Sequence, residues 1–131
     1  MDAKGRSRHR IKGLERVFME NGLREKQEKA VNAVKNCRNP EETGARLWKV
    51  IELYAGQQFY SSKKLPFTYT VKGRELFCDR KEKSITLATI LRAYEKMKAA
   101  QEAGEPIRGP KQLSMFGAPY IWSILKGTGL M

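Results

Sequence analysis

The chain has 131 residues and carries 26 Lys and Arg against 14 Asp and Glu, which gives a formal net charge of +12 at pH 7. This length predicts one domain with an ordinary hydrophobic core. No run approaches the roughly 18 apolar residues of a membrane span, and no apolar segment follows the basic N-terminus, so we expect a cytoplasmic protein without membrane contact or secretory signal. The charge favours a polyanionic partner, and nucleic acid is the commonest polyanion.

Residues 1–10 contain four basic residues and no core-forming segment. We therefore expect a flexible basic arm over 1–10, followed by a single domain over 11–131. Arg6, Arg8 and Arg10 of this arm are candidates for contact with a phosphate backbone. A frayed terminus without a function is the equal alternative.

Two helices are expected before residue 37. Leu14, Val17 and Phe18 have helical spacing, and Asn21-Gly22 is typical of a helix stop. A second helix is expected over 23–36. Its charged run at residues 24–29 is typical of a solvent-exposed face.

The next helix has the clearest signals of the first half. Asn39-Pro40 predicts its start, because Asn is a good N-terminal cap and Pro suits the first helical position. Leu47, Ile51 and Tyr54 lie on one apolar face, and Gly56 is expected to close the helix.

The middle of the chain predicts strands and the end predicts helices. Residues 67–71 alternate with period two and 75–78 return after Lys72-Gly73, which indicates a β-hairpin, with a short edge strand at 58–60. Helices are expected over 84–103 and 118–126. The predicted fold class is α+β, with N-terminal helices, a small antiparallel sheet built on a central β-hairpin, and two C-terminal helices packed on it.

Basic side chains gather between residues 63 and 83, where three acidic residues stand against seven basic ones: Lys63, Lys64, Lys72, Arg74, Arg80, Lys81 and Lys83. The first N–H groups of a helix lack backbone partners and lie at the positive end of the helix dipole. Arg80, Lys81 and Lys83 precede a helix that we expect Ser84 to cap, so this turn is a candidate phosphate site. A solvated turn without a ligand is the alternative.

Aromatic residues are interleaved with these basic residues: Phe59, Tyr60, Phe67, Tyr69 and Phe77. Rings on a sheet face can stack the bases of a single strand, and a hairpin with basic flanks can lie on duplex phosphates. The alternative is that the rings form the core side of the sheet, which we expect for Phe67, Tyr69 and Val71. The sequence leaves DNA or RNA, and single or double strand, open.

Residues for catalysis are scarce. The only histidine is His9, so neither a histidine base nor a histidine-based metal site is expected. The acidic residues near the hairpin lack the spacing of a restriction-type nuclease, and no glycine-rich phosphate loop is present. Cys37 and Cys78 lie far apart without a CxxC pair, which favours buried thiols over a disulfide. We expect no enzyme activity, no metal and no cofactor.

Several segments resemble a block that recurs in small proteins of phages and integrative elements of Firmicutes. They are Gly56-Gln-Gln-Phe-Tyr60, Leu65-Pro-Phe-Thr-Tyr-Thr-Val-Lys-Gly73, Arg80-Lys-Glu-Lys-Ser-Ile-Thr86, Ala93-Tyr94, Gly109-Pro-Lys111 and Phe116-Gly-Ala-Pro-Tyr-Ile-Trp122. The resemblance covers about residues 47–125. That group has no assigned activity, so no residue role is carried over. The resemblance implies a mobile-element role in a bacterial host: a regulator, a nucleic-acid accessory factor, or an inhibitor of a host defence nuclease.

The sequence thus favours a non-catalytic nucleic-acid-binding protein that contacts phosphates through its basic hairpin-to-helix turn. The alternative is an inhibitor of a host defence nuclease, similar to an anti-CRISPR protein, that binds the nuclease or its nucleoprotein complex. A mimic of nucleic acid is normally acidic, so the positive charge speaks against mimicry but leaves binding to guide RNA open. The oligomeric state is not predicted.

Overall fold

The computed structural model describes the backbone of residues 8–81 and 83–131, and the side chains of residues 22–81 and 83–131. A long helix α1, Arg8–Lys35, leads into the rest of the chain. The predicted helix stop at Asn21-Gly22 is wrong, because Gly22 does not take the positive φ that ends a helix and stays within α1. Residues 1–7 of the predicted arm lie outside the described residues, and its last three residues form the start of α1.

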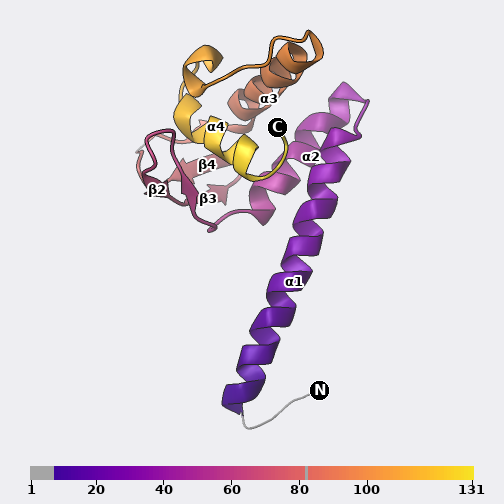
Figure 1. Cartoon of the computed structure of the whole chain (residues 1–131), viewed down its shortest axis with the longest axis vertical. Helices are drawn as coiled ribbons and strands as arrows, with labels where there is room; N and C mark the ends of the chain where they lie inside the picture. Colours follow the sequence, from indigo (N-terminus) through magenta and orange to yellow (C-terminus); the bar gives the residue numbers. More distant parts are fainter. Residues whose placement is uncertain (1–7, 82) are drawn as a thin grey trace.

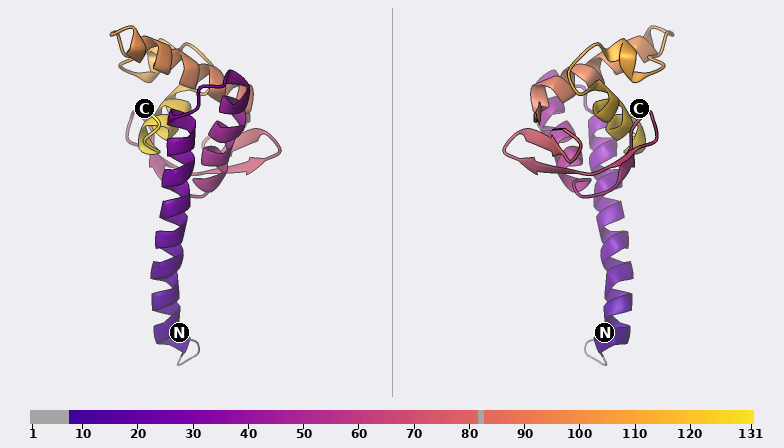
Figure 2. Two further views of the ribbon diagram at one scale, coloured as in Figure 1. Left: turned by 90° about the vertical axis from the view of Figure 1, so that its right-hand side faces the viewer. Right: turned by 90° about the vertical axis from the view of Figure 1, so that its left-hand side faces the viewer.

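Only the C-terminal part of α1 packs on the globular part of the molecule. Val31 and Val34 are buried against the core there, while the N-terminal part of α1 extends away from it (Figures 1 and 2). One residue of the charged run expected to face solvent is also buried. The Gln27 side chain amide donates to the Leu53 carbonyl at 3.0 Å, so α1 is joined to the end of the next helix.

Helix α2, Pro40–Leu53, begins as predicted. The Asn39 side chain accepts a hydrogen bond from the Glu41 N–H at 2.9 Å, and Pro40 takes the first helical position. Leu47 and Ile51 have no exposed surface, which confirms the predicted apolar face.

The C-terminal end of α2 is held by donors from three sources. A helix end leaves its last four carbonyls without helical partners, and a buried carbonyl without a donor is costly. Here the Val50 and Glu52 carbonyls accept from the following backbone, the Leu53 carbonyl accepts from Gln27, and the Ile51 carbonyl accepts from the Tyr69 hydroxyl at 2.7 Å. All four carbonyls are therefore satisfied, and two of the bonds attach other elements to α2.

The strands form two small antiparallel sheets. Strands β1, Phe59–Tyr60, and β2, Pro66–Phe67, pair with each other, while β3, Tyr69–Lys72, β4, Glu75–Cys78, and β5, Ile85–Thr86, form a three-stranded sheet in that order. The hairpin is confirmed, but Lys72 pairs with Glu75, so Gly73 and Arg74 form its turn. Gly73 takes a φ of 64° there, which suits glycine.

The predicted strand 67–71 is divided at Thr68, where the chain passes from one sheet to the other. Thr68 still faces the end of the hairpin: its carbonyl accepts from the Asp79 N–H at 3.0 Å, and its own N–H donates to the Asp79 carboxylate at 3.2 Å. The two sheets are therefore joined side by side, and Phe67 and Tyr69 both remain buried as expected.

Three further helical segments complete the fold: α3, Leu87–Glu102, the 3₁₀ helix η1, Pro110–Leu113, and α4, Ala118–Gly127. Helix α3 packs on α2 and α4, and α4 packs on β1 and covers Phe59 and Phe67 through Gly127 and Tyr120. The predicted α+β class, with a small antiparallel sheet and two C-terminal helices, is confirmed. Within the described helices, none has an apolar stretch long enough to cross a membrane.

Changing Tyr69 to Phe should destabilise the fold by about 1–3 kcal/mol at pH 7, because the buried Ile51 carbonyl loses its donor. Burial, with a smaller effect of Tyr54, raises the pKa of Tyr69, so this side chain stays neutral in the native state. Above pH ~10 a tyrosine ionises in the unfolded chain, and the free energy of unfolding of the wild type then falls by about 1.4 kcal/mol per pH unit. The Phe variant has no phenol at this position and does not show this fall. Urea unfolding at pH 7 and pH 11 should therefore show the deficit of the variant shrinking at high pH.

The matched control is Tyr60→Phe, because Tyr60 is exposed and its hydroxyl bonds only to the exposed Gln58 side chain. This change should alter the free energy of unfolding by less than about 0.5 kcal/mol. An equal loss in the two variants, or a deficit of Tyr69→Phe that does not depend on pH, would contradict the role given to the buried bond.

Candidate nucleic-acid interface

The hairpin divides the predicted basic cluster into two groups. Lys72 and Arg74 lie at the turn between β3 and β4, whereas Arg80 and Lys81 follow β4 at the opposite end of the hairpin. A strand of four residues separates the groups, which corresponds to about 13 Å. The cluster is therefore not one site, although all four side chains are exposed.

The start of α3 lies beside the first group and not beside Arg80 and Lys81. The Leu87 N–H donates to the Arg74 carbonyl at 3.0 Å, and Thr86 is the N-terminal cap that accepts from the Thr89 N–H. The prediction that Ser84 caps this helix is wrong, because Ile85 and Thr86 first pair with β4 and so move the helix start. Ser84 instead donates to the Glu75 carboxylate.

The position of β5 also contradicts the predicted phosphate site. Arg80, Lys81 and Lys83 do not stand directly before a helix N-terminus, since β5 lies between them and α3. Lys83 is exposed in the connection from β4 to β5. Any anion bound by these side chains is therefore held by the side chains themselves and gains nothing from the α3 dipole.

The structure brings Arg80 and Lys81 close to the loop that joins β1 and β2. The Asp79 N–H donates to the Thr68 carbonyl, and the chain then turns, with the Lys81 N–H donating to the Cys78 carbonyl at 3.2 Å. The Arg80 side chain reaches β2, where its Nη1 lies 3.4 Å from the Pro66 carbonyl oxygen. Lys63 and Lys64 are in the adjoining loop, between Tyr60 and its partner Pro66. We call these four exposed residues the basic end of the sheet: Lys63, Lys64, Arg80 and Lys81.

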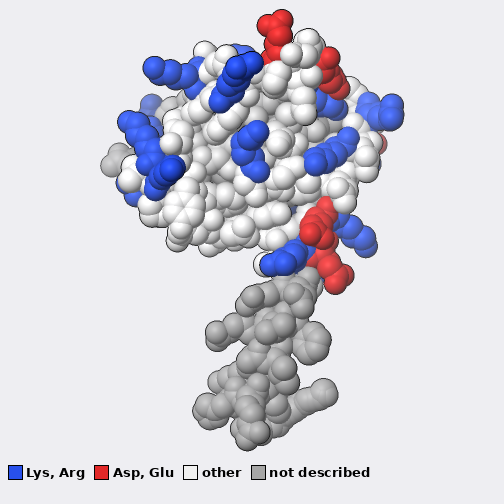
Figure 3. Space-filling model, in the orientation of Figure 1, with Lys and Arg blue, Asp and Glu red and all other residues white. Residues whose placement is uncertain are grey.

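The space-filling view agrees with this arrangement. Figure 3 shows Lys and Arg side chains gathered at the left edge of the globular part, over the β1–β2 hairpin. The loop with Lys63 and Lys64 and the turn with Arg80 and Lys81 are separate in the sequence, and the Thr68–Asp79 junction and the Arg80–Pro66 contact join them. The basic end is therefore a product of the sheet arrangement.

The side chain of Lys81 continues the basic end onto the start of α4. Its Nζ lies 5.6 Å from the centre of the Phe116 ring and 6.0 Å from that of Tyr120, distances at which a cation is attracted to an aromatic face. Tyr120 in turn packs edge-on against Phe67, with ring centres 5.0 Å apart. Phe116 was not among the residues that the sequence suggested for the site, although it stands just before the helix start, where a side chain can remain outside the core.

The carboxylate nearest the basic end in the described chain is already hydrogen-bonded. Asp79 accepts from both the N–H and the hydroxyl of Thr68, whereas Glu75, which accepts from Ser84, lies at the turn end of the hairpin beside Lys72. Within residues 22–81 and 83–131, Arg46 and Glu42 form the one ion pair. Glu82 lies outside the described residues. Among the described side chains, the cations of the basic end thus have no carboxylate within ion-pair distance.

The remaining predicted contacts are far from this end or outside the described part. Arg6 lies outside the described residues. Arg8 and Arg10 are in the first turn of α1, whose side chains are not described, at the end of the helix that points away from the globular part (Figure 1). The N-terminal arginines and the basic end are therefore separate regions.

The interleaved aromatic residues divide between core and surface. Phe59, Phe67 and Tyr69 are buried and stack on one another, with ring centres 6.0 Å apart between Phe59 and each of the other two. The expectation that Phe67 and Tyr69 belong to the core is confirmed, and Val71 is half-buried. Tyr60 and Phe77 are exposed and remain accessible to a ligand.

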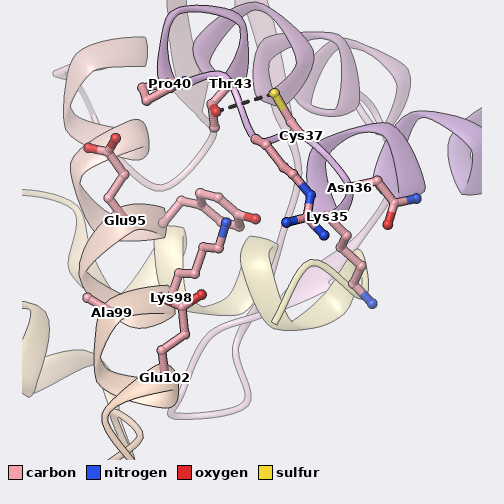
Figure 4. Close-up of a pocket in the computed structure, with 11 residues that line it drawn as sticks. Lys35, Asn36, Cys37, Pro40, Thr43, Glu95, Lys98, Ala99 and Glu102 are labelled. Carbon is pink, nitrogen blue, oxygen red and sulfur yellow. Dashed lines mark hydrogen bonds between the residues drawn. The ribbon is translucent and has the colours of Figure 1, made fainter.

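A hollow in the described part of the molecule lies elsewhere, between the α1–α2 connection and α3 (Figure 4). It measures about 650 Å³, and its charged lining mixes Lys35, Arg38 and Lys98 with Glu95 and Glu102. Tyr94 also lines the hollow and is buried, and this burial raises the pKa of its phenol. Because its charges alternate in sign, the hollow does not select a polyanion.

Both cysteines are buried and unlinked, as predicted. Burial raises the pKa of the Cys78 thiol, which keeps it protonated and unreactive at neutral pH. No group of three or more potential metal ligands occurs among residues whose placement is described. Comparison with protein-family models, curated proteins and solved structures found no match for the chain.

The corrected helix start can be tested by removing the two candidate caps in turn. Thr86→Ala should lower the free energy of unfolding by about 1 kcal/mol, because the Thr89 N–H loses its acceptor. Ser84→Ala removes only an exposed bond to Glu75 and should cost less, about 0.5 kcal/mol or below. Urea unfolding of both variants measures the difference. A larger loss for Ser84→Ala than for Thr86→Ala would identify Ser84 as the cap.

Proposed function

We propose that this protein binds nucleic acid without catalysis and holds phosphates at the basic end of its sheet. The observation that carries the proposal is the convergence of Lys63, Lys64, Arg80 and Lys81 from two loops onto one exposed edge. Cations placed together without carboxylate partners repel one another, and a polyanion relieves that repulsion. The formal net charge of +12 adds long-range attraction for the same class of partner.

Each of the two loops is held in place by contacts of its own. Arg80 and Lys81 are positioned by the pairing of Asp79 with Thr68 and by the aromatic rings under Lys81, so their side chains lose little freedom when a phosphate binds. Lys63 and Lys64 lie in a loop closed by the Ser61–Leu65 and Ser61–Lys64 backbone hydrogen bonds. Lys and Arg contacts of this kind position the nucleic acid, and they carry no sequence preference by themselves.

Binding should depend steeply on salt, because each neutralised phosphate releases a condensed counterion. Four contacts predict a slope of log K against log [salt] of about −3.6 for a duplex and about −2.8 for a single strand. Fluorescence anisotropy with labelled 20-nucleotide DNA and RNA, from about 20 to 200 mM salt, measures the slope. Absence of binding at the lowest salt, to every form of nucleic acid tried, would overturn the proposed function and favour a protein target.

The position of the site can be tested by removing two charges from either end of the same hairpin. Arg80→Gln with Lys81→Gln should reduce the salt slope by about 2 and weaken binding accordingly. Lys72→Gln with Arg74→Gln removes the same charge from the turn end and should change the slope by less than about 0.5, a value below one contact.

Both double variants lower the net charge equally, so a difference between them cannot come from overall charge. All four side chains are exposed, and thermal unfolding should show both variants folded. Equal losses would mean that charge acts over the whole surface, and a larger loss at Lys72 and Arg74 would move the site to the start of α3.

A further inference from the structure

The basic end is also where large apolar side chains lie open to solvent. Tyr60 is 58%, Leu65 43% and Phe116 44% exposed, and the structure keeps all three beside the cations. Tyr60 pairs with Pro66, whose carbonyl oxygen lies by Arg80; Leu65 follows Lys64; and the Phe116 ring lies under Lys81. Only two other large apolar side chains are comparably exposed within the described part, Leu23 and Phe77.

We propose that this edge is a single-strand platform, on which unpaired bases stack on Phe116 and Tyr60 while the basic end holds the neighbouring phosphates. The proposal rests on the proposed function, and it names the form of nucleic acid that the site takes. An aromatic ring gains about 1–3 kcal/mol from each base that stacks on it. Only a single strand offers bases for such stacking, since a duplex keeps its bases inside and presents phosphates.

The spacing of cation and ring fits one nucleotide. The Lys81 Nζ stands 5.6 Å from the centre of Phe116, so one side of the ring is next to a positive charge and much of the rest is open. A base lying on the open part of the ring brings its own phosphate within reach of Lys81 or Arg80. Tyr60 pairs with Pro66, whose carbonyl oxygen lies 3.4 Å from the Arg80 Nη1, and it supplies a second ring for another base.

Protein contact is the other use for exposed rings, and the surroundings favour nucleic acid. Protein interfaces exclude lysine from their centre, because burying an ammonium is costly. Here the Lys81 ammonium lies over the Phe116 ring, and the loop between Tyr60 and Pro66 carries two further lysines. No described carboxylate is in ion-pair contact with these cations. A surface that is both basic and aromatic is typical of single-strand binding.

The test compares one labelled 20-nucleotide strand alone with the same strand annealed to its complement, as DNA and as RNA, at one low salt concentration. Phe116→Ala should weaken single-strand binding about 5- to 150-fold and duplex binding less than about 2-fold, because only the single strand stacks. Tyr60→Ala should show the same selectivity. Phe116→Trp should retain single-strand binding, since indole also stacks.

Phe77→Ala is the matched control, because Phe77 is similarly exposed but lies on the outward face of β4, opposite Thr70. It should leave both affinities within about 2-fold, the size of an uninvolved surface change. Thermal unfolding confirms that each variant is folded.

The outcomes separate the two proposals. If the wild type binds both forms but Phe116→Ala loses single-strand and duplex affinity equally, or loses neither, the platform is refuted and phosphate binding stands. A loss at Phe77→Ala as large as that at Phe116→Ala would remove the platform from the basic end. If the wild type binds no nucleic acid in any form, the proposed function itself fails and the exposed rings become a protein contact.

Discussion

The buried C-terminal end of α2 is the constraint on which the rest of the structure depends. The Ile51 carbonyl there bonds in a buried site and the Leu53 carbonyl in a partly buried one, and a helix end leaves both without helical partners, so each needs a donor from elsewhere. Two donors come from other elements: Gln27 of α1 and Tyr69 of β3. These two bonds attach the long helix and the central hairpin to the same point, and the Tyr69 carbonyl in turn accepts from the Gly56 N–H at 2.9 Å. The positions of α1 and of the central hairpin therefore both depend on this end of α2.

The inward positions of Tyr69 and Phe67 also determine where the candidate interface lies. Tyr69 must point inward to reach Ile51, and Phe67 must point inward to pack against Phe59 and Tyr120. The residue between them, Thr68, then pairs with Asp79 and joins the two sheets. This junction carries Arg80 and Lys81 to the β1–β2 loop. The grouping of these cations at one end of the sheet is thus a consequence of core packing a few residues away.

Features that depend on neighbouring residues were predicted well. Asn39 caps α2, Gly73 lies in the hairpin turn, and Phe67 and Tyr69 face the core, because capping, turn geometry and strand alternation are decided within a few residues. Ser84 does not cap α3, because β5 pairs with β4 first and Thr86 then takes the cap position. Gly22 is exposed and has no neighbouring side chain, yet it stays within α1, so the local Asn-Gly signal did not end the helix.

The sequence by itself determined the class of fold, the hairpin, the positive charge and the set of basic residues around it. It could not show which of them share a surface, since Lys63 and Lys64 meet Arg80 and Lys81 only through the pairing of Thr68 with Asp79. The sequence also did not show that Lys72 and Arg74 lie at the other end of the hairpin, or that Phe116 lies beside Lys81. Those relations come from contacts between distant parts of the chain, which form only when the buried polar groups and rings of the core find their partners.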